Sequence, residues 1–397
     1  MENTKENLWS KSYIFILLAN LFIYLSFYLL VPTLPTYAKQ TGGSAIEASL
    51  VVSIFSITAL SFRFLVGKAS RKFGHVRVIL MAAAVLALTT FSYIFIPIIG
   101  IILVRIIQGA GWGMASTTVA SLVSEIVPEK RRGEGMGYYS LSMIIAMSLA
   151  PVVGIMVMNA YSFRFIAYTS IVFMIIAAFL LKGVKVDKGK RENAKYEDKG
   201  FSMQDLFEKT ALLPSFLCFF LAMTLCAIMS YIMLYGKEIK MNNIWIYFIG
   251  HVTMILVTRP FIGKIFDRVG QKVVIIPGAA AMIIGLLILA NVHSVPTLIA
   301  ASLFYGFGYG AVQPSLQAWA VNRAPAHRKA EANSTFLSSM DLGFTFGPIL
   351  LSMVAAGKGY GFMYGISSIF MIIFIAVYLL KTAGASENEQ DEIEEAS

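Results

Sequence analysis

Long apolar runs separated by short polar stretches recur along the whole chain, and they constrain its fold more than any other feature. A helix of about 20 apolar residues crosses a hydrocarbon core of about 30 Å. Irregular backbone cannot face lipid, so each run is predicted to be a helix. The runs predict an all-α membrane protein with twelve transmembrane helices, at residues 13–37, 47–66, 78–96, 98–125, 135–158, 162–181, 212–236, 243–262, 273–291, 295–320, 332–356 and 360–380.

Composition supports the membrane class and argues against a soluble enzyme. Of 397 residues, 57% are hydrophobic and 14% are charged, whereas a soluble globular chain carries about 25% charged residues. The formal net charge of +10 lies in short loops between apolar runs, which fits membrane topology better than nucleic-acid binding. The first run, from Tyr13, is too long for the core of a signal peptide.

The lysines and arginines are distributed unequally between the two sides of the predicted bundle. One side, with both termini, carries 24 of them and the other side carries 5. Positive residues accumulate on the cytoplasmic side, so both termini are predicted to be cytoplasmic. The predicted domains are a six-helix bundle at 1–185, a charged cytoplasmic linker at 186–211, a second six-helix bundle at 212–382, and an acidic disordered tail at 383–397.

The two halves are related in sequence. Arg63 and Gly67 match Arg259 and Gly263 at an offset of 196 residues, and the glycine-rich segment from Gly109 matches that from Gly306 at an offset of 197. Further matches at one of these offsets are Gly74 with Gly270, Glu134 with Glu331, and Pro151 with Pro348. A constant offset across separated landmarks predicts two homologous bundles arranged as parallel repeats, as in alternating-access transporters.

Three motifs make the chain resemble the major facilitator superfamily, and within it the twelve-span drug/proton antiporter-like efflux branch. Residues 67–77 look like motif A, and the copy at 263–272 is closer to the usual pattern. Residues 105–111 resemble motif B. Ala146, Ala150, Pro151 and Gly154 resemble the antiporter motif C, which the second half keeps more fully as Gly343, Gly347 and Pro348. The segment around Asp341 also resembles bacterial sugar-efflux and metallophore-exporter relatives.

The resemblance implies that the motif A segments are gates. Their glycines permit tight turns. Asp267 is expected at the positive N-terminal end of the fifth span. At the equivalent position the first copy has Arg71, and we expect it to pair with Glu331 when the cytoplasmic side is closed. The residues assigned to this gate are Arg63, Gly67, Arg71, Gly74, Arg259, Gly263, Asp267, Arg268, Gly270, Glu134 and Glu331.

Three side chains are candidates for proton coupling. Asp341 lies nine residues into its span, roughly 14 Å deep, and an ionised carboxylate there must be paired, hydrated or protonated. Arg105 lies roughly 10 Å deep in the fourth span, and the resemblance implies a part in proton coupling. The first span offers Asn20 rather than an acid, which shifts the expected proton site to Asp341. His251, in the eighth span, is the third candidate, because the ordinary histidine pKa lies in the physiological range.

The resemblance also places spans 1, 4, 7 and 10 around a central cavity. Aromatic side chains there would accept apolar or cationic substrates by stacking and cation–π contacts. The candidate lining residues are Asn20, Tyr24, Gln108, Trp112, Thr224, Tyr231, Gln313, Gln317 and Trp319.

The preferred function is proton-coupled efflux, by antiport, of a small amphipathic molecule. One alternative is an exporter of a metallophore or sugar, and another is a proton-coupled uptake symporter. The sequence has no Walker-type loop, which argues against ATP-driven pumping, and it shows no cofactor motif or metal-ligand cluster. We expect a monomer in the bacterial inner membrane whose partners are lipid, protons and a small-molecule substrate, without nucleic acid.

Overall fold

A computed structural model describes residues 8–63, 66–128, 131–184, 208–325 and 328–395. In these ranges the regular elements are helices. The chain divides into two compact units. The first comprises Met1–Gly200 together with Met229–Leu234, and the second comprises Phe201–Ile228 together with Tyr235–Ser397.

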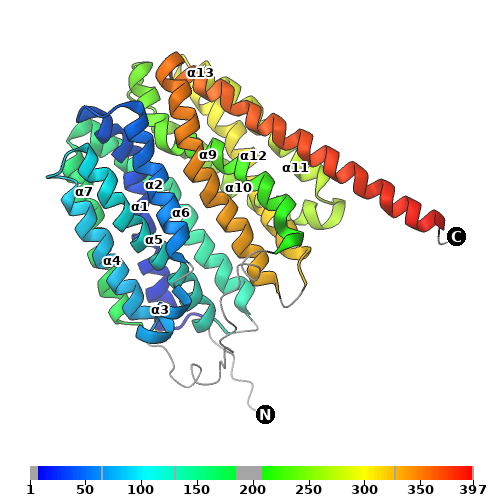
Figure 1. Ribbon diagram of the computed structural model, residues 1–397, viewed down its shortest axis with the longest axis horizontal. Coiled ribbons are helices and arrows are strands. Elements are labelled where there is room, and N and C mark those ends of the chain that lie inside the picture. The colour runs from blue at the N-terminus through cyan, green and yellow to red at the C-terminus, as the bar shows by residue number, and fades with distance from the viewer. Residues whose placement is uncertain (1–7, 64–65, 129–130, 185–207, 326–327, 396–397) are drawn as a thin grey trace, which may run out of the picture. The chain divides into compact units, whose positions relative to one another are not determined.

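The first unit is a bundle in which α1 packs on α6 and α7, α2 packs on α5, and α4 packs on α5 and α7. Figure 1 shows these helices lying side by side. They are α1 (Lys11–Gln40), α2 (Ala45–Arg63), α3 (Val66–Phe73), α4 (His75–Ser92), α5 (Ile98–Ile126), α6 (Arg132–Ala160) and α7 (Phe163–Lys182).

In the second unit, α12 packs on α10 and α11, and α11 packs on α13. The elements are the 3₁₀ turn η3 (Lys209–Ala211), α9 (Leu212–Glu238), α10 (Ile246–Val269), α11 (Lys272–Ala290), α12 (Val295–Asn322) and α13 (Lys329–Glu395). The last of these is interrupted at Gly359, whose φ of +84° is not helical. Figure 1 shows α13 changing direction sharply between its orange and red parts.

The predicted spans correspond to these helices. Among the described residues, ten helices are long and apolar enough to cross a membrane. One of the ten, Glu331–Thr382, contains both the eleventh and the twelfth predicted spans on either side of Gly359. The eighth predicted span falls on α10, which is apolar over Ile246–Arg259. The all-helical membrane fold is therefore confirmed.

Both motif A segments contain helix and turn at a glycine. In the first, residues 66–73 form the short helix α3, and the chain turns at Gly74 with a φ of +86°. In the second copy α10 continues to Val269, and the turn comes at Gly270 with a φ of +95°. In the second unit α13 continues to Glu395. The alanines, glutamates and glutamine of its last part favour helix.

The internal repeat is visible in helix packing within each unit. A Cβ atom added to Gly109 of α5 would overlap the Phe55 backbone of α2, and one added to Gly113 would overlap Ala59. In the second unit, Gly306 of α12 meets the backbone of His251 on α10 in the same way. Phe55 and His251 are 196 residues apart, the offset already seen for Arg63 and Arg259. The same close helix contact is therefore built twice.

Candidate functional site

The guanidinium of Arg105 is buried inside the first unit, where its side chain is 4% exposed. Its Nε donates a hydrogen bond to the carbonyl oxygen of Val51 at 2.6 Å, and its Nη1 donates to Oε1 of Gln108 at 2.5 Å. The guanidinium carbon lies 4.0 Å from the centre of the Phe55 ring, a cation–π contact. Among the described residues, no carboxylate contacts Arg105.

Gln108 connects Arg105 to α4 and to the turn that follows it. The hydroxyl of Tyr93 donates to Gln108 Oε1 at 2.6 Å, and Gln108 Nε2 donates to Thr90 Oγ1 at 3.0 Å. Thr90 in turn donates to the carbonyl oxygen of Leu86 at 2.7 Å. The cation is thus held by neutral acceptors and an aromatic face. An arginine cannot shed its proton in a protein, so this site is a permanent positive charge.

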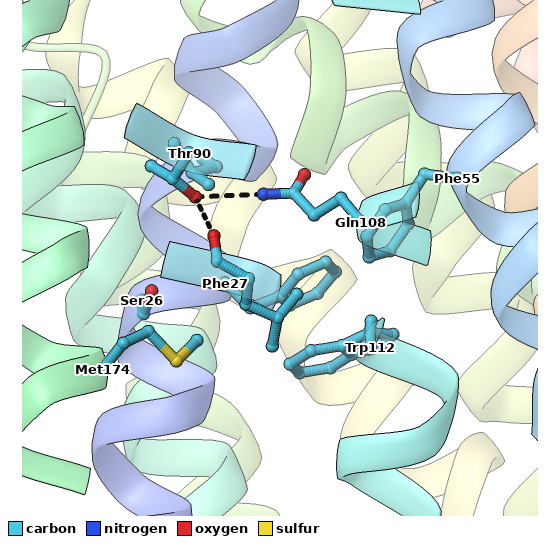
Figure 2. Close-up of a pocket in the computed structure, with 9 residues that line it drawn as sticks. Ser26, Phe27, Phe55, Thr90, Gln108, Trp112 and Met174 are labelled. Atoms are coloured by element: carbon cyan, nitrogen blue, oxygen red, sulfur yellow. Dashed lines mark hydrogen bonds between the residues drawn. The ribbon is translucent and has the colours of Figure 1, made fainter. Parts of the chain in front are cut away.

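A small cavity lies beside this network, and Figure 2 shows Gln108 pointing across it toward Thr90. The cavity has a volume of about 10 Å³, which is room for about one water molecule. Drug-sized pockets are about 300–1,000 Å³, so this cavity does not enclose a substrate of that size. Its lining residues are Ser26, Phe27, Leu30, Phe55, Leu86, Thr90, Gln108, Trp112 and Met174.

An aromatic cluster closes the other side of the cavity. Phe27 stacks on Trp112 with ring centres 3.9 Å apart and on Phe55 with ring centres 5.3 Å apart. Tyr24 meets the edge of Trp112 at 4.9 Å. Tyr24 and Trp112 were predicted cavity residues, and both are buried in this cluster, each 6% exposed.

Asp341 lies on α13 at the level where that helix contacts α9. The hydroxyl of Ser339, two residues earlier, donates to the carbonyl oxygen of Ser215 at 2.5 Å. A Cβ atom added to Gly343, two residues later, would lie 2.6 Å from the carbonyl oxygen of Phe219. The Asp341 side chain is half-buried. It stands ten residues after Glu331, where the apolar stretch begins, or roughly 15 Å along the helix.

His251 is 1% exposed in the second unit and is surrounded by tyrosine rings. Its ring centre lies 6.0 Å from that of Tyr247, 5.6 Å from that of Tyr305 and 5.8 Å from that of Tyr309. Neither imidazole nitrogen has a hydrogen-bond partner among the described residues, and the hydroxyl of Tyr247 has none either. The hydroxyls of Tyr305 and Thr224 are hydrogen-bonded to each other at 2.9 Å.

The remaining predicted cavity residues are buried or half-buried. Asn20 donates to Ser142 Oγ at 2.7 Å and so links α1 to α6. Gln313 donates to Gln317 at 3.3 Å, and Gln317 donates to Asn333 of α13 at 2.8 Å. The other members, Tyr231 and Trp319, are 1% and 7% exposed.

The motif C residues form close helix contacts. A Cβ atom added to Gly154 would lie 3.1 Å from the carbonyl oxygen of Leu29 on α1. One added to Gly347 would lie 3.0 Å from Cα of Met223 on α9. Small residues at these positions let the helices approach each other closely. Pro151 and Pro348 lie inside α6 and α13 in the same segments.

Part of the predicted gate lies outside the described structure. The side chains of Arg71, Glu134 and Asp267 are not described, so the expected pairing of Arg71 with Glu331 stays a prediction. Gly67 lies within α3 and Gly263 within α10. Arg63 is half-buried at the end of α2, whereas Arg259 and Arg268 are exposed.

The residues that hold Arg105 were not predicted from the sequence. Phe55, Tyr93 and Thr90 were not candidates, because an aromatic or hydroxyl side chain within an apolar run has no distinctive pattern of its own. The repeat contained a signal for one of them, since its offset of 196 residues pairs Phe55 with His251.

The family model of the Major Facilitator Superfamily matches residues 16–257 and 244–396. The staphylopine export protein of Staphylococcus aureus is 22% identical over 363 residues, which cover 88% of this chain and 90% of that protein. The multi-drug resistance efflux pump PmrA of Streptococcus pneumoniae is 24% identical over 356 residues, covering 84% and 86%.

Among solved structures, a bacterial homolog of the human lysosomal transporter Spinster superposes with a TM-score of 0.76 at 12% identity. The superposition covers 93% of this chain and 96% of the Spinster homolog, and the likeness concerns the fold alone. The family model and the helical fold agree with the motifs found in the sequence. This chain belongs to the major facilitator superfamily, as a multi-pass membrane transporter and not an enzyme.

Proposed function

We propose that the chain is a proton-coupled antiporter that exports a small amphipathic molecule by alternating access. The observation that carries the coupling is Asp341, a carboxylate within a predicted membrane span and beside the α9–α13 contact. Two relatives named for export or multidrug efflux support the direction of transport.

Asp341 is the proposed proton acceptor. Charging a carboxylate in a low-dielectric site costs free energy, so its proton affinity depends on whether water reaches it. Alternating access changes that hydration between the two faces of the membrane. A proton bound from the outside and released to the cytoplasm would then accompany each outward step of the substrate.

Arg105 is proposed to supply a fixed positive charge in the first unit. Its described contacts are a backbone carbonyl, a neutral amide and an aromatic ring, so no protein carboxylate among them cancels its charge. Burial of such a charge is tolerated only where other groups compensate it. The positive field would favour the deprotonated state of an acid, or an anionic substrate group, that approaches it during the cycle.

The substrate is proposed to be amphipathic because the candidate lining residues combine aromatic rings with amides and hydroxyls. Rings supply apolar faces, and the few polar groups fix orientation. The staphylopine export relative favours a second candidate, the export of one specific metabolite such as a metallophore, rather than of many drugs. A monomer with both termini in the cytoplasm completes the proposal.

The test is transport into inverted membrane vesicles that carry the full-length chain and have an acidic lumen. Antiport predicts that a substrate from a panel of cationic dyes, metallophores and sugars accumulates inside, and that collapse of the pH gradient abolishes accumulation. Vesicles with the same amount of an Asp341→Asn variant are the matched control. Accumulation that survives collapse of the gradient, or that requires the reversed gradient, would contradict proton antiport.

A further inference from the structure

The cluster around His251 contains three buried polar atoms that the described protein leaves without hydrogen bonds. They are both imidazole nitrogens of His251 and the hydroxyl of Tyr247. His251 is 1% exposed and Tyr247 is 0% exposed, so the membrane or bulk water does not reach them in this conformation. An unsatisfied buried polar group costs free energy, and three in one place are unlike a settled helix-packing contact.

The internal repeat allows His251 to be compared with the residue at the equivalent position of the first unit. Its counterpart in the first unit is Phe55, the ring on which the Arg105 guanidinium rests at 4.0 Å. The counterpart of Arg105, at an offset of 197, is Ser302, whose hydroxyl donates to Ile299 of its own helix at 2.7 Å. The first unit thus has a fixed cation on α5 over an aromatic ring on α2. The second has a neutral serine on α12 and, on α10, a side chain that can become a cation.

The rings around His251 lie at distances at which they could also stabilise a cation. Tyr247, Tyr305 and Tyr309 have ring centres 6.0, 5.6 and 5.8 Å from the imidazole centre. A cation within about 6 Å of an aromatic ring is stabilised by the ring's quadrupole. The arrangement resembles that of Arg105 and Phe55. The difference is that Arg105 is always charged, whereas His251 can be neutral or protonated.

The titratable neighbours do not supply a fixed counter-charge. On α10 the nearest titratable group is Tyr247, and on α12 they are Tyr305 and Tyr309. Cys226 and Cys218 of α9 lie near Tyr305 and Tyr309 respectively, and Arg259 of α10 lies near Tyr309. His251 itself is 1% exposed, so its imidazole is shielded from water in this conformation. Its protonation therefore depends on whether water enters the cluster.

We propose that His251, enclosed by Tyr247, Tyr305 and Tyr309, is a second proton-binding site of the transporter. In the conformation described here the imidazole is dry and neutral. When a conformational change admits water, a lone pair on one ring nitrogen takes a proton from hydronium and leaves a water molecule. When the next conformational change removes this water from the cluster, the proton is released to water on the side of the membrane that is open at that stage. This inference rests on the proposed proton-coupled function and adds a titrating group to Asp341.

The direct test needs no substrate. The full chain, with histidines labelled with ¹⁵N in the imidazole ring, is placed in lipid nanodiscs, and the ring signals are followed between about pH 5 and pH 8, around the ordinary histidine pKa of about 6.5. The chain has 4 histidines, and the signal absent from a His251→Gln variant identifies His251. The proposal expects this signal to move from the neutral to the imidazolium position within the range. A His251 signal that stays at the neutral position throughout this range overturns it.

A transport measurement separates this inference from the proposed function. His251→Phe installs the residue that the repeat has at position 55, and it removes both unsatisfied nitrogens, so we expect it to fold at least as well as the wild type. His293→Gln is the matched control, because it removes an exposed histidine that lies outside this cluster, between α11 and α12. The probe is a dye that the wild type accumulates in acidic-lumen vesicles.

With that dye, His251→Phe and His251→Gln are expected to lower gradient-driven accumulation at least fivefold. His293→Gln should stay within twofold of the wild type. Wild-type accumulation and pH dependence in both His251 variants would overturn the inference while leaving the proposed function intact. A wild-type protein that shows no gradient-driven transport of any probe would instead refute the proposed function, and the nanodisc titration would then decide the proton site alone.

Discussion

The contact between α9 and α13 depends on the absence of a side chain at Gly343. A Cβ atom there would lie 2.5 Å from Cβ of Ala222 and 2.6 Å from the carbonyl oxygen of Phe219. Carbon atoms in favourable contact are about 3.5–4.0 Å apart, so Gly343→Ala forces α13 away from α9. Overpacking of this kind costs about 1–3 kcal/mol.

This cost converts to a measurable change in melting temperature. For units of about 150–250 residues, each kcal/mol shifts the midpoint by about 2–4 °C, so we expect Gly343→Ala to lower it by about 2–12 °C. The assay is intrinsic fluorescence during heating of the purified protein in detergent. Transport should fall as well, because Asp341 lies two residues away on the same helix.

Gly357 provides the matched control, because it is on the same helix and an added Cβ atom there would meet nothing within 4 Å. Glycine within a helix is less stable than alanine by about 0.5–1 kcal/mol, so Gly357→Ala should leave the melting temperature unchanged or raise it. Equal effects of the two substitutions would refute the packing argument.

Three further substitutions test contacts elsewhere in the chain. Glu238→Ala should destabilise the second unit by about 0.5–2 kcal/mol, because both carboxylate oxygens accept from the Tyr360 N–H at 3.1 Å. Glu238→Gln keeps an acceptor and should therefore have a melting temperature near that of the wild type. Arg105→Lys keeps the charge but loses the planar fork that reaches both Val51 and Gln108, so we expect at least a tenfold loss of gradient-driven transport; wild-type transport would show that charge alone suffices. Arg71→Asp should impair transport and a second change, Glu331→Arg, should partly restore it; no recovery in a double variant that reaches the membrane would count against that pair.

The membrane fold could be predicted from the sequence because lipid imposes strong and local constraints. A run of apolar residues long enough to cross the hydrocarbon must be helical. Apart from the short α3, each α-helix in the described part of the chain overlaps a predicted span. The repeat was also readable, since glycines such as Gly109 and Gly306 are required wherever two backbones approach closely. The turn at Gly359 lies between the last two predicted spans.

The interior of the site was less predictable, because it depends on contacts between residues far apart in the chain. Gln108 was assigned to a substrate cavity, yet in the structure it binds Arg105, Tyr93 and Thr90. Nothing in the local sequence indicates that Phe55 carries a cation on its face. The short helix α3 was missed because its polar residues resemble a cytoplasmic loop when only hydropathy is considered.

We propose that Asp341 couples proton flow to substrate flow. The most direct test measures both flows in the same preparation. Proteoliposomes with wild type or Asp341→Asn are loaded with a pH-sensitive dye, and a substrate found in the vesicle panel is followed with and without an imposed pH gradient. We expect Asp341→Asn to lose uphill, gradient-driven transport and substrate-induced proton movement but to keep downhill exchange. Full gradient-driven transport by Asp341→Asn, with proton movement equal to that of the wild type, would contradict it.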